Sequence, residues 1–205
     1  MKKIDCIFVR RHFEKKFLVA DEINPGCEWV FNGEGVATIK WDGTAVYIDE
    51  NLKCYQRYQV KPARNKAPII PEGSMLCDEK EDRTLYWIPA TDKWIIEAYN
   101  GHKWFIDIRN NQRFHTPGTY EAIGPKINGN RYNLSGEHVL IRHGIVVDEE
   151  EPARDFQSIK KYLKEFKSNL FVQDDNDCFH EGLVYHHPDG RMAKIRRADF
   201  GFTDV

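Results

Sequence analysis

Short runs of β-branched and aromatic residues recur along most of this sequence, and they constrain its fold more than any other feature. Within a run, apolar residues fall at roughly alternate positions, which is typical of a strand with one buried face. Aromatic residues make up 13% of the 205 residues, and strands favour them because rings pack across neighbouring strands. The pattern predicts strands over residues 4–10, 36–40, 44–48, 53–60, 85–89, 93–99, 104–109, 120–124, 139–147, 183–186 and 192–196.

Turn and helix signals complete the expected fold. Residues 155–169 place apolar side chains at helical spacing after Asp155, a residue type that caps helix starts. A shorter helix is expected between His12 and Glu22. Turns are predicted at residues 49–51, 100–101 and 188–190. The sequence thus predicts an α+β fold of mostly antiparallel sheets with a few packed helices, built as a single domain over residues 1–205.

The composition is that of an ordinary globular protein. Hydrophobic residues make up 41% of the chain and charged residues 30%, which excludes long disorder and fibrous architectures. No run of about 18 apolar residues is present, so neither a spanning helix nor a membrane partner is expected. Five cysteines without a C-x-x-C pair favour neither a disulfide framework nor a zinc knuckle. We therefore expect an intracellular protein, cytoplasmic or nuclear, that acts as a monomer.

Positive charge is concentrated in one stretch of the chain. Residues 51–71 contain no acidic residue, and their basic residues alternate with Tyr55 and Tyr58. Basic side chains between aromatic rings suit a nucleic-acid strand, because they neutralise phosphates while the rings stack on bases. A solvated surface without a partner is the alternative. The candidate RNA-binding residues are Lys53, Lys61, Arg64, Lys66 and, from a second basic cluster, Arg197.

Four short motifs follow one another along the chain. They are K-W-D-G at residues 40–43, a glutamate-bearing segment at 119–130, E-G-L-V at 181–184 and K-I-R at 194–196. K-x-D-G alone would occur by chance in roughly one chain of this length in twenty. In this order, the four motifs resemble the nucleotidyltransferase motifs of the covalent ligase superfamily, and most closely those of the ATP-dependent RNA ligases. The resemblance covers the chain from about residue 36 to residue 201.

One of these segments narrows the resemblance. Residues 121–130, E-A-I-G-P-K-I-N-G-N, are most similar to the small RNA 5′–3′ ligases of viruses and vertebrates. A viral origin is therefore one that the resemblance allows. The fold it implies is the nucleotidyltransferase domain, an ATP-grasp-like ligase domain. Only eight residues follow Arg197, so we expect no C-terminal OB-fold of the kind that DNA ligases and capping enzymes carry.

The resemblance also implies a three-step reaction. Lys40 attacks ATP to give an AMP–lysine intermediate and pyrophosphate. AMP then moves to an RNA 5′-phosphate, and a 3′-hydroxyl attacks this activated end, seals the strand and releases AMP. A free lysine has a pKa of about 10.4, so roughly one in a thousand is neutral at pH 7.4. Burial and a nearby cation both favour the neutral amine that this attack requires.

The roles of individual residues follow from the same resemblance. Asp42, Glu121 and Glu181 would hold a hydrated Mg²⁺ or Mn²⁺, because converging carboxylates are costly unless a divalent cation balances them. Lys194 would bind the α-phosphate and stabilise charge on its oxygens. The nucleotide-binding residues it implies are Lys40, Arg57, Glu121, Glu181, Lys194 and Arg196, and Gly43 and Gly182 would let the backbone approach the nucleotide.

Two features depart from the pattern of relatives. Ile39 stands where many relatives carry an acidic residue before the lysine, and Tyr120 precedes Glu121 where a glycine is common. The aromatic residue that would stack on adenine is not identified. The candidates are Tyr86, Trp87 and Phe114, each of which is alternatively a core residue.

Each motif also has a structural interpretation. Asp42 would then stabilise a turn, Glu181 would be a surface acid, and residues 194–197 would form an outward-facing basic row on an edge strand. At the level of function, two alternatives to an RNA ligase remain. One is a capping-type guanylyltransferase that uses GTP, and the other is a non-catalytic domain that binds RNA or a nucleotide.

Overall fold

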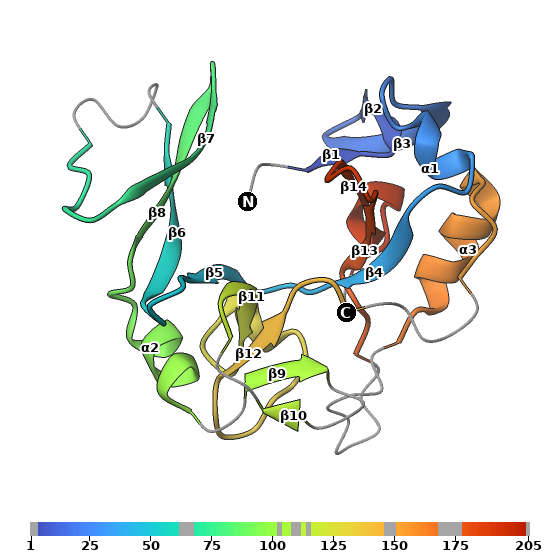
Figure 1. The fold of residues 1–205 in the computed structure, drawn as a ribbon. Helices are drawn as coiled ribbons and strands as arrows, with labels where there is room; N and C mark the ends of the chain where they lie inside the picture. The colour runs from blue at the N-terminus through green and yellow to red at the C-terminus, as the bar shows by residue number, and fades with distance from the viewer. Residues whose placement is uncertain are drawn as a thin grey trace. The chain divides into compact units, whose positions relative to one another are not determined.

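The computed structural model describes residues 4–61, 68–101, 104–107, 112–113, 116–145, 151–167 and 178–203. They form two compact units, whose elements are labelled in Figure 1. Unit 1 is built from residues 42–143, and unit 2 is built from residues 4–41 and 144–205. The chain therefore passes from unit 2 to unit 1 between Trp41 and Asp42, and it returns between His143 and Gly144.

Unit 2 is organised around a four-stranded sheet. Its strand order is β1 (Asp5–Cys6), β14 (Met192–Arg196), β13 (Gly182–His186) and β4 (Val36–Lys40), with β1 parallel to β14 and the other pairs antiparallel. The remaining elements are the hairpin of β2 (Phe8–Phe13) and β3 (Lys16–Ile23), the helices α1 (Glu28–Phe31) and α3 (Phe156–Glu165), and the 3₁₀ helix η2 (Arg197–Phe200).

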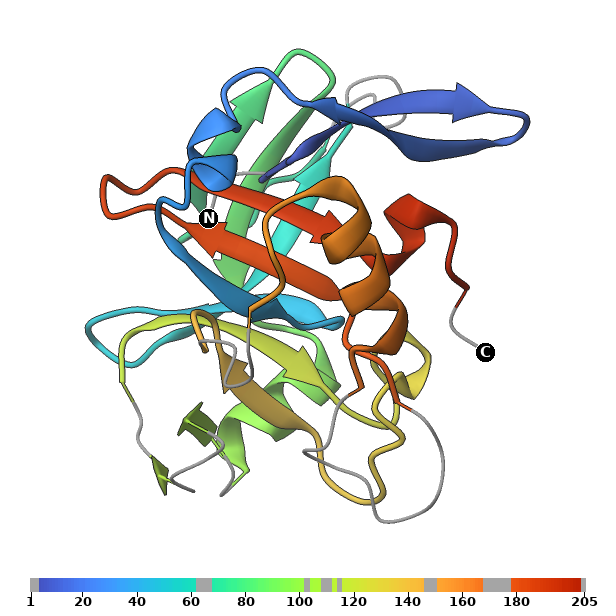
Figure 2. The same cartoon turned by 90° about the vertical axis from the view of Figure 1, so that its right-hand side faces the viewer.

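The two faces of this sheet differ in polarity because side chains alternate along each strand. One face carries apolar residues, including Leu183, Tyr185 and Ile195, which are fully buried in one cluster with Ile159 and Leu163 of α3. Figure 2 shows α3 lying across this sheet. The opposite face carries the basic side chains of β4 and β14. Unit 2 therefore has one face that forms its core and one face that presents charge.

Unit 1 is organised around an eight-stranded sheet. Its order is β10 (Gln112–Arg113), β9 (Trp104–Asp107), β12 (Val139–Arg142), β11 (Gly118–Ile123), β5 (Thr44–Ile48), β6 (Cys54–Val60), β8 (Arg83–Pro89) and β7 (Met75–Lys80). All pairs are antiparallel except β9 with β12. The other elements are α2 (Lys93–Asn100) and the 3₁₀ helix η1 (Asn128–Asn130).

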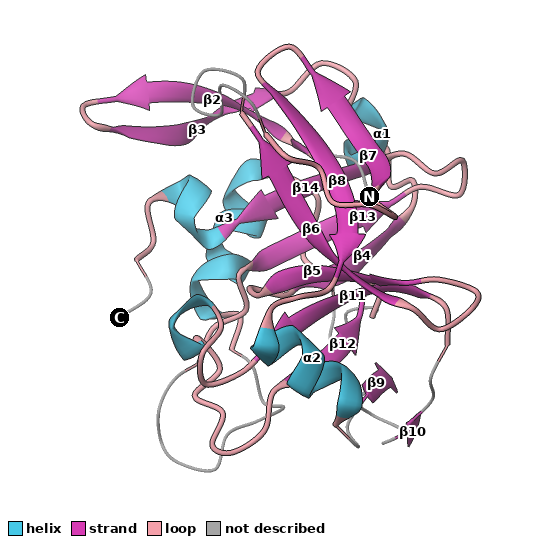
Figure 3. Cartoon of the chain, turned by 90° about the vertical axis from the view of Figure 1, so that its left-hand side faces the viewer, coloured by secondary structure: helices cyan, strands magenta, loops and turns pink. Residues whose placement is uncertain are grey.

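Helix α2 covers one face of the unit 1 sheet. Its buried residues Ile95 and Ala98 pack in one cluster with Val46, Tyr120 and Leu140 from the central strands. Figure 3 shows the helix beside β11 and β12. This cluster forms the core on one face of the unit 1 sheet. The residues that alternate with these along each strand point to the other face.

The predicted fold class is confirmed at this level: the protein is α+β, mostly antiparallel sheet, with three α-helices among the described residues. The strands predicted over 36–40, 44–48 and 192–196 have the predicted bounds. The helix predicted over residues 155–169 is confirmed for residues 156–165, which form α3, but it ends before Phe166. The Asp155 carboxylate caps α3 by accepting from Ser158 N at 2.9 Å. In the part of the chain that is described, no helix is both long and apolar enough to cross a membrane.

The strand predicted over residues 93–99 is wrong, because this segment is helix α2. Asp92 caps the helix, since its carboxylate accepts from Trp94 N at 2.8 Å and Ile95 N at 3.3 Å. The predicted hairpin turn at 100–101 is therefore wrong as well, because Asn100 ends the helix and Gly101 is its C-terminal cap. Apolar residues in this segment satisfy both periodicities, and the cap decides in favour of the helix.

The helix expected between His12 and Glu22 is also wrong, because this segment forms the β2–β3 hairpin. The chain reverses at Glu14, whose φ of 52° lies in the left-handed region that a continuous helix excludes.

Strand β7 was not predicted from the sequence. It contains Asp78, Glu79 and Lys80, which are uncommon in strands, and its pairing with β8 sets its conformation.

Removing the cap of α2 tests the account of this correction. We expect Asp92→Ala to lower the free energy of unfolding by about 1 kcal/mol, because two backbone N–H groups lose their acceptor. Asp155→Ala is the matched change on α3. Thermal unfolding followed by circular dichroism measures both, and an unchanged melting temperature for Asp92→Ala would contradict the assignment of the cap.

Candidate functional site

The predicted nucleophile lies at the end of strand β4 in unit 2. Lys40 is opposite Gly182 of β13, and Gly182 is opposite Arg196 of β14, so the three residues form one row across the sheet. The Lys40 ammonium forms an ion pair with the carboxylate of Glu181 and lies 3.4 Å from Trp41 O. Because Gly182 has no side chain, nothing from β13 separates the two basic residues of the row.

Lys194 lies on the same face, one row away. It is opposite Val184, two positions along β13 from Gly182. Burial lowers the pKa of Lys194 to about 8, and the nearby positive charges of Lys40, Arg196 and Arg10 act in the same direction, opposed by Glu181. A lysine in this environment carries a charge that the surrounding protein stabilises poorly. An anionic ligand placed on this face would stabilise it.

Arg196 is held in place by a buried acid. Its Nη2 donates to Asp199 Oδ1 at 2.8 Å, and Arg10 Nη2 lies 2.9 Å from the same oxygen. Burial raises the pKa of Asp199, but hydrogen bonding and charge from Arg196 and Arg10 outweigh it, so the pKa lies below its usual value. Arg196 Nη1 is also 4.0 Å from Glu181 Oε1. Glu181 therefore lies within ion-pair distance of both basic residues of the row.

Strand β14 is an inner strand, paired with β1 on one side and β13 on the other. The alternative of a basic row on an edge strand therefore fails for Lys194 and Arg196. Arg197, predicted to bind RNA, is buried, and its guanidinium donates to the carbonyls of Leu163 and Lys164 at the end of α3. A cation at the end of a helix is stabilised by the free carbonyls there, so these contacts account for Arg197 structurally.

In unit 1, the Asp42–Gly43 turn is held by the segment that follows β11. Asp42 Oδ2 accepts from Arg131 Nε at 2.6 Å, and Asp42 Oδ1 accepts from Asn128 Nδ2 at 3.1 Å. The Asp42 amide donates to Tyr132 Oη at 2.9 Å. The structural alternative for Asp42, a turn-stabilising acid, thus accounts for part of its role, because it fixes two segments distant in sequence.

The backbone of that segment explains its unusual composition. Asn128, Gly129 and Asn130 have φ values of 44°, 70° and 56°, so three consecutive residues lie in the left-handed region. Asparagine and glycine tolerate this conformation best. The N-G-N signature therefore shapes the loop that brings the Asn128 and Arg131 side chains to Asp42.

Glu121 lies on β11 and is buried. Its Oε1 accepts from Gly43 N at 3.0 Å, and its Oε2 is 2.9 Å from His143 Nε2. Glu121 therefore binds the turn that follows the predicted nucleophile and holds the imidazole of a residue at the boundary of unit 1. Both contacts stabilise its carboxylate inside the unit.

Gly43 and Gly182 are required by the packing of protein backbone. A Cβ on Gly43 would lie 2.1 Å from Ala122 O, and a Cβ on Gly182 would lie 2.0 Å from Ile195 O. Atoms cannot approach so closely, so any other residue at either position would displace a neighbouring strand. The sequence suggested close approach of a nucleotide instead, and strand packing gives a sufficient reason for both glycines.

The three predicted metal-binding acids each have a partner inside their own unit. Asp42 pairs with Arg131 and Glu121 contacts His143 in unit 1, whereas Glu181 pairs with Lys40 in unit 2. No group of three or more His, Cys, Asp or Glu residues that could hold a metal ion occurs among the described residues. Their carboxylates are oxygen donors of the kind that Mg²⁺ prefers, but they do not form a ready-made protein cage.

Arg57 lies exposed on β6, opposite Trp87 of β8. The rings of Tyr47 and Tyr55 lie 6.0 Å apart, and Tyr47 lies 5.8 Å from Trp87. Trp87 is buried together with Tyr55, so Trp87, a candidate for stacking on adenine, is a core residue.

The other candidates lie elsewhere. Lys53 and Lys61 are exposed, and Tyr86 lies opposite Tyr58 of β6. The candidates that lie outside the described residues are Arg64, Lys66 and Phe114.

Several residues of this arrangement were not predicted from the sequence. They are Arg10, Asn128, Arg131, Tyr132, His143 and Asp199. Of these residues, only Asn128 had a signal in the sequence, because it belongs to the N-G-N run inside the motif at residues 121–130. The others act through long-range pairings that neither spacing nor composition reveals.

Two comparisons with known proteins found similarity to this chain. The family model described as RNA ligase 1 matches residues 110–204. A curated relative, RNA ligase 1 from Danio rerio, is 34% identical over 87 residues, which are 40% of this chain and 24% of the relative. The chain thus spans about a quarter of the length of this relative. The predicted resemblance to RNA ligases is confirmed over the matched part.

The family match covers one part of the predicted site. Residues 110–204 include Glu121, Glu181 and the basic residues of β14, but they stop short of Lys40 and Asp42. The link to those two residues is structural: Lys40 pairs with Glu181, and the Asp42–Gly43 turn is bound by Glu121. Each residue outside the match is therefore in contact with an acid inside it.

Lys194→Met tests the burial of charge on this face. The folded pKa of about 8 lies below that of an unfolded lysine, so charged Lys194 disfavours folding at pH values below 8. Between pH 8 and about 10.4 the unfolded chain binds the extra proton, so the stability of the parent rises with pH. We expect Lys194→Met to melt at a higher temperature than the parent below pH 8 and to lack this part of the rise.

Lys161→Met, on the exposed side of α3, is the control for this change. Melting temperatures of parent and variants across pH 6 to about pH 10 give the comparison. Parallel pH profiles for the parent and Lys194→Met would contradict a lowered pKa at Lys194.

Proposed function

We propose that this chain, which matches the RNA ligase 1 family model over residues 110–204, is an ATP-dependent RNA ligase. In this proposal it joins an RNA 5′-phosphate to a 3′-hydroxyl through an AMP–lysine intermediate and an adenylylated RNA end. The observation that carries the proposal is the placement of Lys40, Lys194 and Arg196 on one face of the unit 2 sheet, with Glu181 beside Lys40.

The first step is nucleophilic attack by Lys40. Its Nζ forms a bond to the α-phosphorus of ATP, the bond from that phosphorus to the bridging oxygen breaks, and pyrophosphate leaves. The amine must lose a proton, and in this proposal Glu181 Oε2, the partner of Nζ in the ion pair, accepts it. Glu181 thus combines two tasks: it holds the lysine in position and accepts its proton.

Lys194 and Arg196 bind the charge that moves during this step. Negative charge grows on the α-phosphate oxygens and on the leaving pyrophosphate, and both residues lie on the face from which Lys40 attacks. Arg196 is fixed by Asp199, so it needs little reorganisation when charge develops. Arg57, exposed on β6 of unit 1, is the proposed contact for the ribose or for the RNA end.

A divalent cation accompanies ATP in this proposal. Mg²⁺ commonly binds through one or two carboxylates together with substrate phosphates, and it retains several waters. The acids proposed to bind it are Asp42 and Glu121 of unit 1 and Glu181 of unit 2, whose carboxylates are oxygen donors of the kind that Mg²⁺ prefers. Bound there, Mg²⁺ or Mn²⁺ would neutralise negative charge at the phosphates.

Covalent labelling tests the proposal directly. Incubation with α-labelled ATP and Mg²⁺ should label the protein, and loss of this label in Lys40→Arg should identify the attachment site, because arginine keeps the charge without a usable amine. Glu181→Gln should reduce the labelling rate by about 10²-fold or more, since it removes the proton acceptor. Labelling by GTP instead of ATP would favour the capping-type guanylyltransferase, and no label from either nucleotide would favour a non-catalytic binding domain.

A second test concerns the basic stretch of residues 51–71. If Lys53, Lys61, Arg64 and Lys66 bind the RNA backbone, neutralising Lys53, Lys61 and Lys66 together should lower strand sealing by a larger factor than it lowers labelling by ATP. The ratio of the two rates, measured on one preparation of each variant, is the readout. Equal losses in both steps would show that the stretch acts through the fold.

A further inference from the structure

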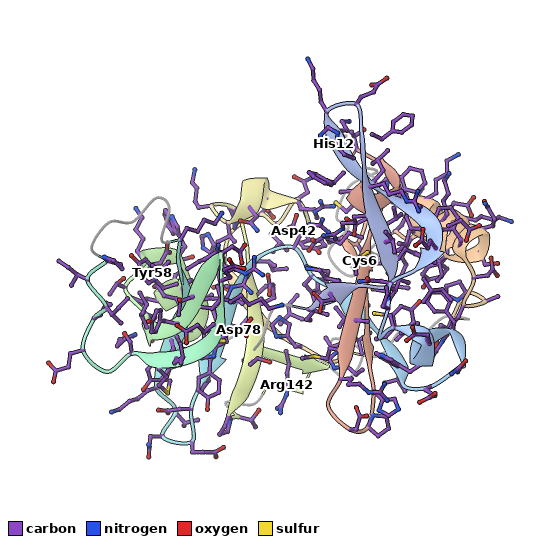
Figure 4. The ribbon with its side chains drawn as sticks, turned by 90° about the horizontal axis from the view of Figure 1, so that it is seen from above. Cys6, His12, Asp42, Tyr58, Asp78 and Arg142 are labelled. Atoms are coloured by element: carbon purple, nitrogen blue, oxygen red, sulfur yellow. The ribbon has the colours of Figure 1, made fainter. Side chains whose placement is uncertain are left out.

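The β2–β3 hairpin of unit 2 is a two-stranded sheet of its own. Its strands pair with each other and with no other described strand. The base of the hairpin is attached to the unit, because Phe8 is buried among Phe31, Phe156 and Phe200, and Arg10 pairs with Asp199. All residues from 11 to 17 are exposed. Figures 2 and 4 show the hairpin extending from the unit, and Figure 4 labels His12 near its outer end.

The outer end of the hairpin carries two phenylalanines that are not covered. Phe13 and Phe17 are each 65% exposed. Burial of a phenylalanine side chain contributes about 1.5–3 kcal/mol, so two exposed rings at one end of a hairpin forgo a large stabilisation. An exposed aromatic ring at the tip of a hairpin offers a flat face on which a nucleic-acid base can stack.

The strand register places one ring on each face of the hairpin. Phe17 is opposite His12, and their rings meet edge to face with centroids 5.0 Å apart. Phe13 is opposite Lys16. Since neighbouring residues on a strand point to opposite faces, His12 with Phe17 and Phe13 with Lys16 form two separate surfaces, each an aromatic ring beside a nitrogen-bearing side chain.

The charge around these rings favours an anionic partner. Residues 11–17 contain three basic residues and one acidic residue, which gives a net charge of +2 with His12 neutral. Arg11 pairs with Glu22, so Lys15 and Lys16 contribute most of the positive charge at the turn. A hydrophobic protein surface would not require these lysines, whereas a polyphosphate strand is complementary to them.

We propose that residues 11–17 bind unpaired nucleotides of RNA, with bases stacked on Phe13 and Phe17 and phosphates bound by Lys15 and Lys16. Unpaired bases fit because their faces are open, whereas bases in a duplex already stack on each other. The site lies outside residues 110–204, the part matched by the family, and it is separate from the basic stretch at 51–71. The proposal rests on the proposed function for the choice of RNA as the ligand.

Anisotropy measurements with a short labelled single-stranded RNA, without ATP, test this site. Phe13→Ser/Phe17→Ser should weaken binding by at least about fivefold for each ring that stacks, and it should weaken binding to blunt duplex RNA far less. Leu76→Ser is the matched control, because Leu76 is 61% exposed on β7 of unit 1. Melting temperatures show whether each variant folds, and photo-crosslinking with mass spectrometry should place the RNA on residues 11–17 of the parent protein.

The lysines give an independent readout. Lys15→Ala/Lys16→Ala should reduce the slope of log affinity against log salt by up to about 1.4, as expected for two contacts to a single strand. Lys161→Ala/Lys164→Ala on α3 is the control, and it should leave this slope unchanged.

Three outcomes would overturn the proposal. Unchanged single-strand affinity in the phenylalanine variant is one, and an equal loss for single-stranded and duplex RNA is another, because stacking requires open bases. The third is concentration-dependent self-association of the parent that Phe13→Ser/Phe17→Ser abolishes while RNA binding stays intact, which would identify a second copy as the occupant. Labelling of the unaltered protein by ATP is measured separately, so failure of the hairpin site and failure of the ligase proposal are distinguishable.

Discussion

Crowding of positive charge on one face of the unit 2 sheet is the constraint on which the rest of this site depends. Lys40 and Arg196 lie in one row across the sheet, and Lys194 lies in the next row on the same face. Arg10, which pairs with Asp199, is a fourth cation. Two acids offset them. Glu181 lies within ion-pair distance of Lys40 and Arg196, and buried Asp199 holds Arg196 and Arg10. With four cations against two carboxylates, the face keeps an excess of positive charge, and burial of Lys194 prevents water from screening it fully.

The Asp42–Gly43 turn in unit 1 shows a different way of fixing a functional segment. Glu121 accepts from Gly43 N, and the left-handed loop at 128–130 brings Arg131 to Asp42. The glycine has no alternative, because a Cβ there would lie 2.1 Å from a carbonyl oxygen of β11. A turn held by its backbone, its side chain and its packing has little freedom left. The turn follows Trp41 directly, so the residues that come soon after the proposed nucleophile are held rigidly.

How far the sequence predicts this molecule depends on whether a residue acts through its neighbours in sequence or through distant pairings. Alternation alone was enough for β4, β5 and β14, and the capped apolar stripe was enough for α3. Residues 93–100 satisfied two periodicities, and the decision lay in Asp92, whose capping role requires the geometry to be known. The motif order brought Lys40 and Glu181 into one hypothesis, and the register of β4 with β13 places them together. The partners His143, Arg131 and Asp199 carry no local signal, since each meets its acid or base only after the sheets form.

The excess charge also explains why an anion is the natural ligand of the unit 2 face. In the protein alone, burial and like charges oppose the ammonium form of Lys194, and this opposition lowers the stability of the fold near neutral pH. A bound phosphate would offset the positive charge around Lys194 and raise its pKa again, so binding above pH 8 would be coupled to proton uptake. The free energy that the fold gives up to keep unbalanced cations together is thereby recovered when a phosphate binds. The arrangement of cations that lowers the stability of the protein alone therefore also strengthens the preference of this face for a polyphosphate over a neutral ligand of equal size.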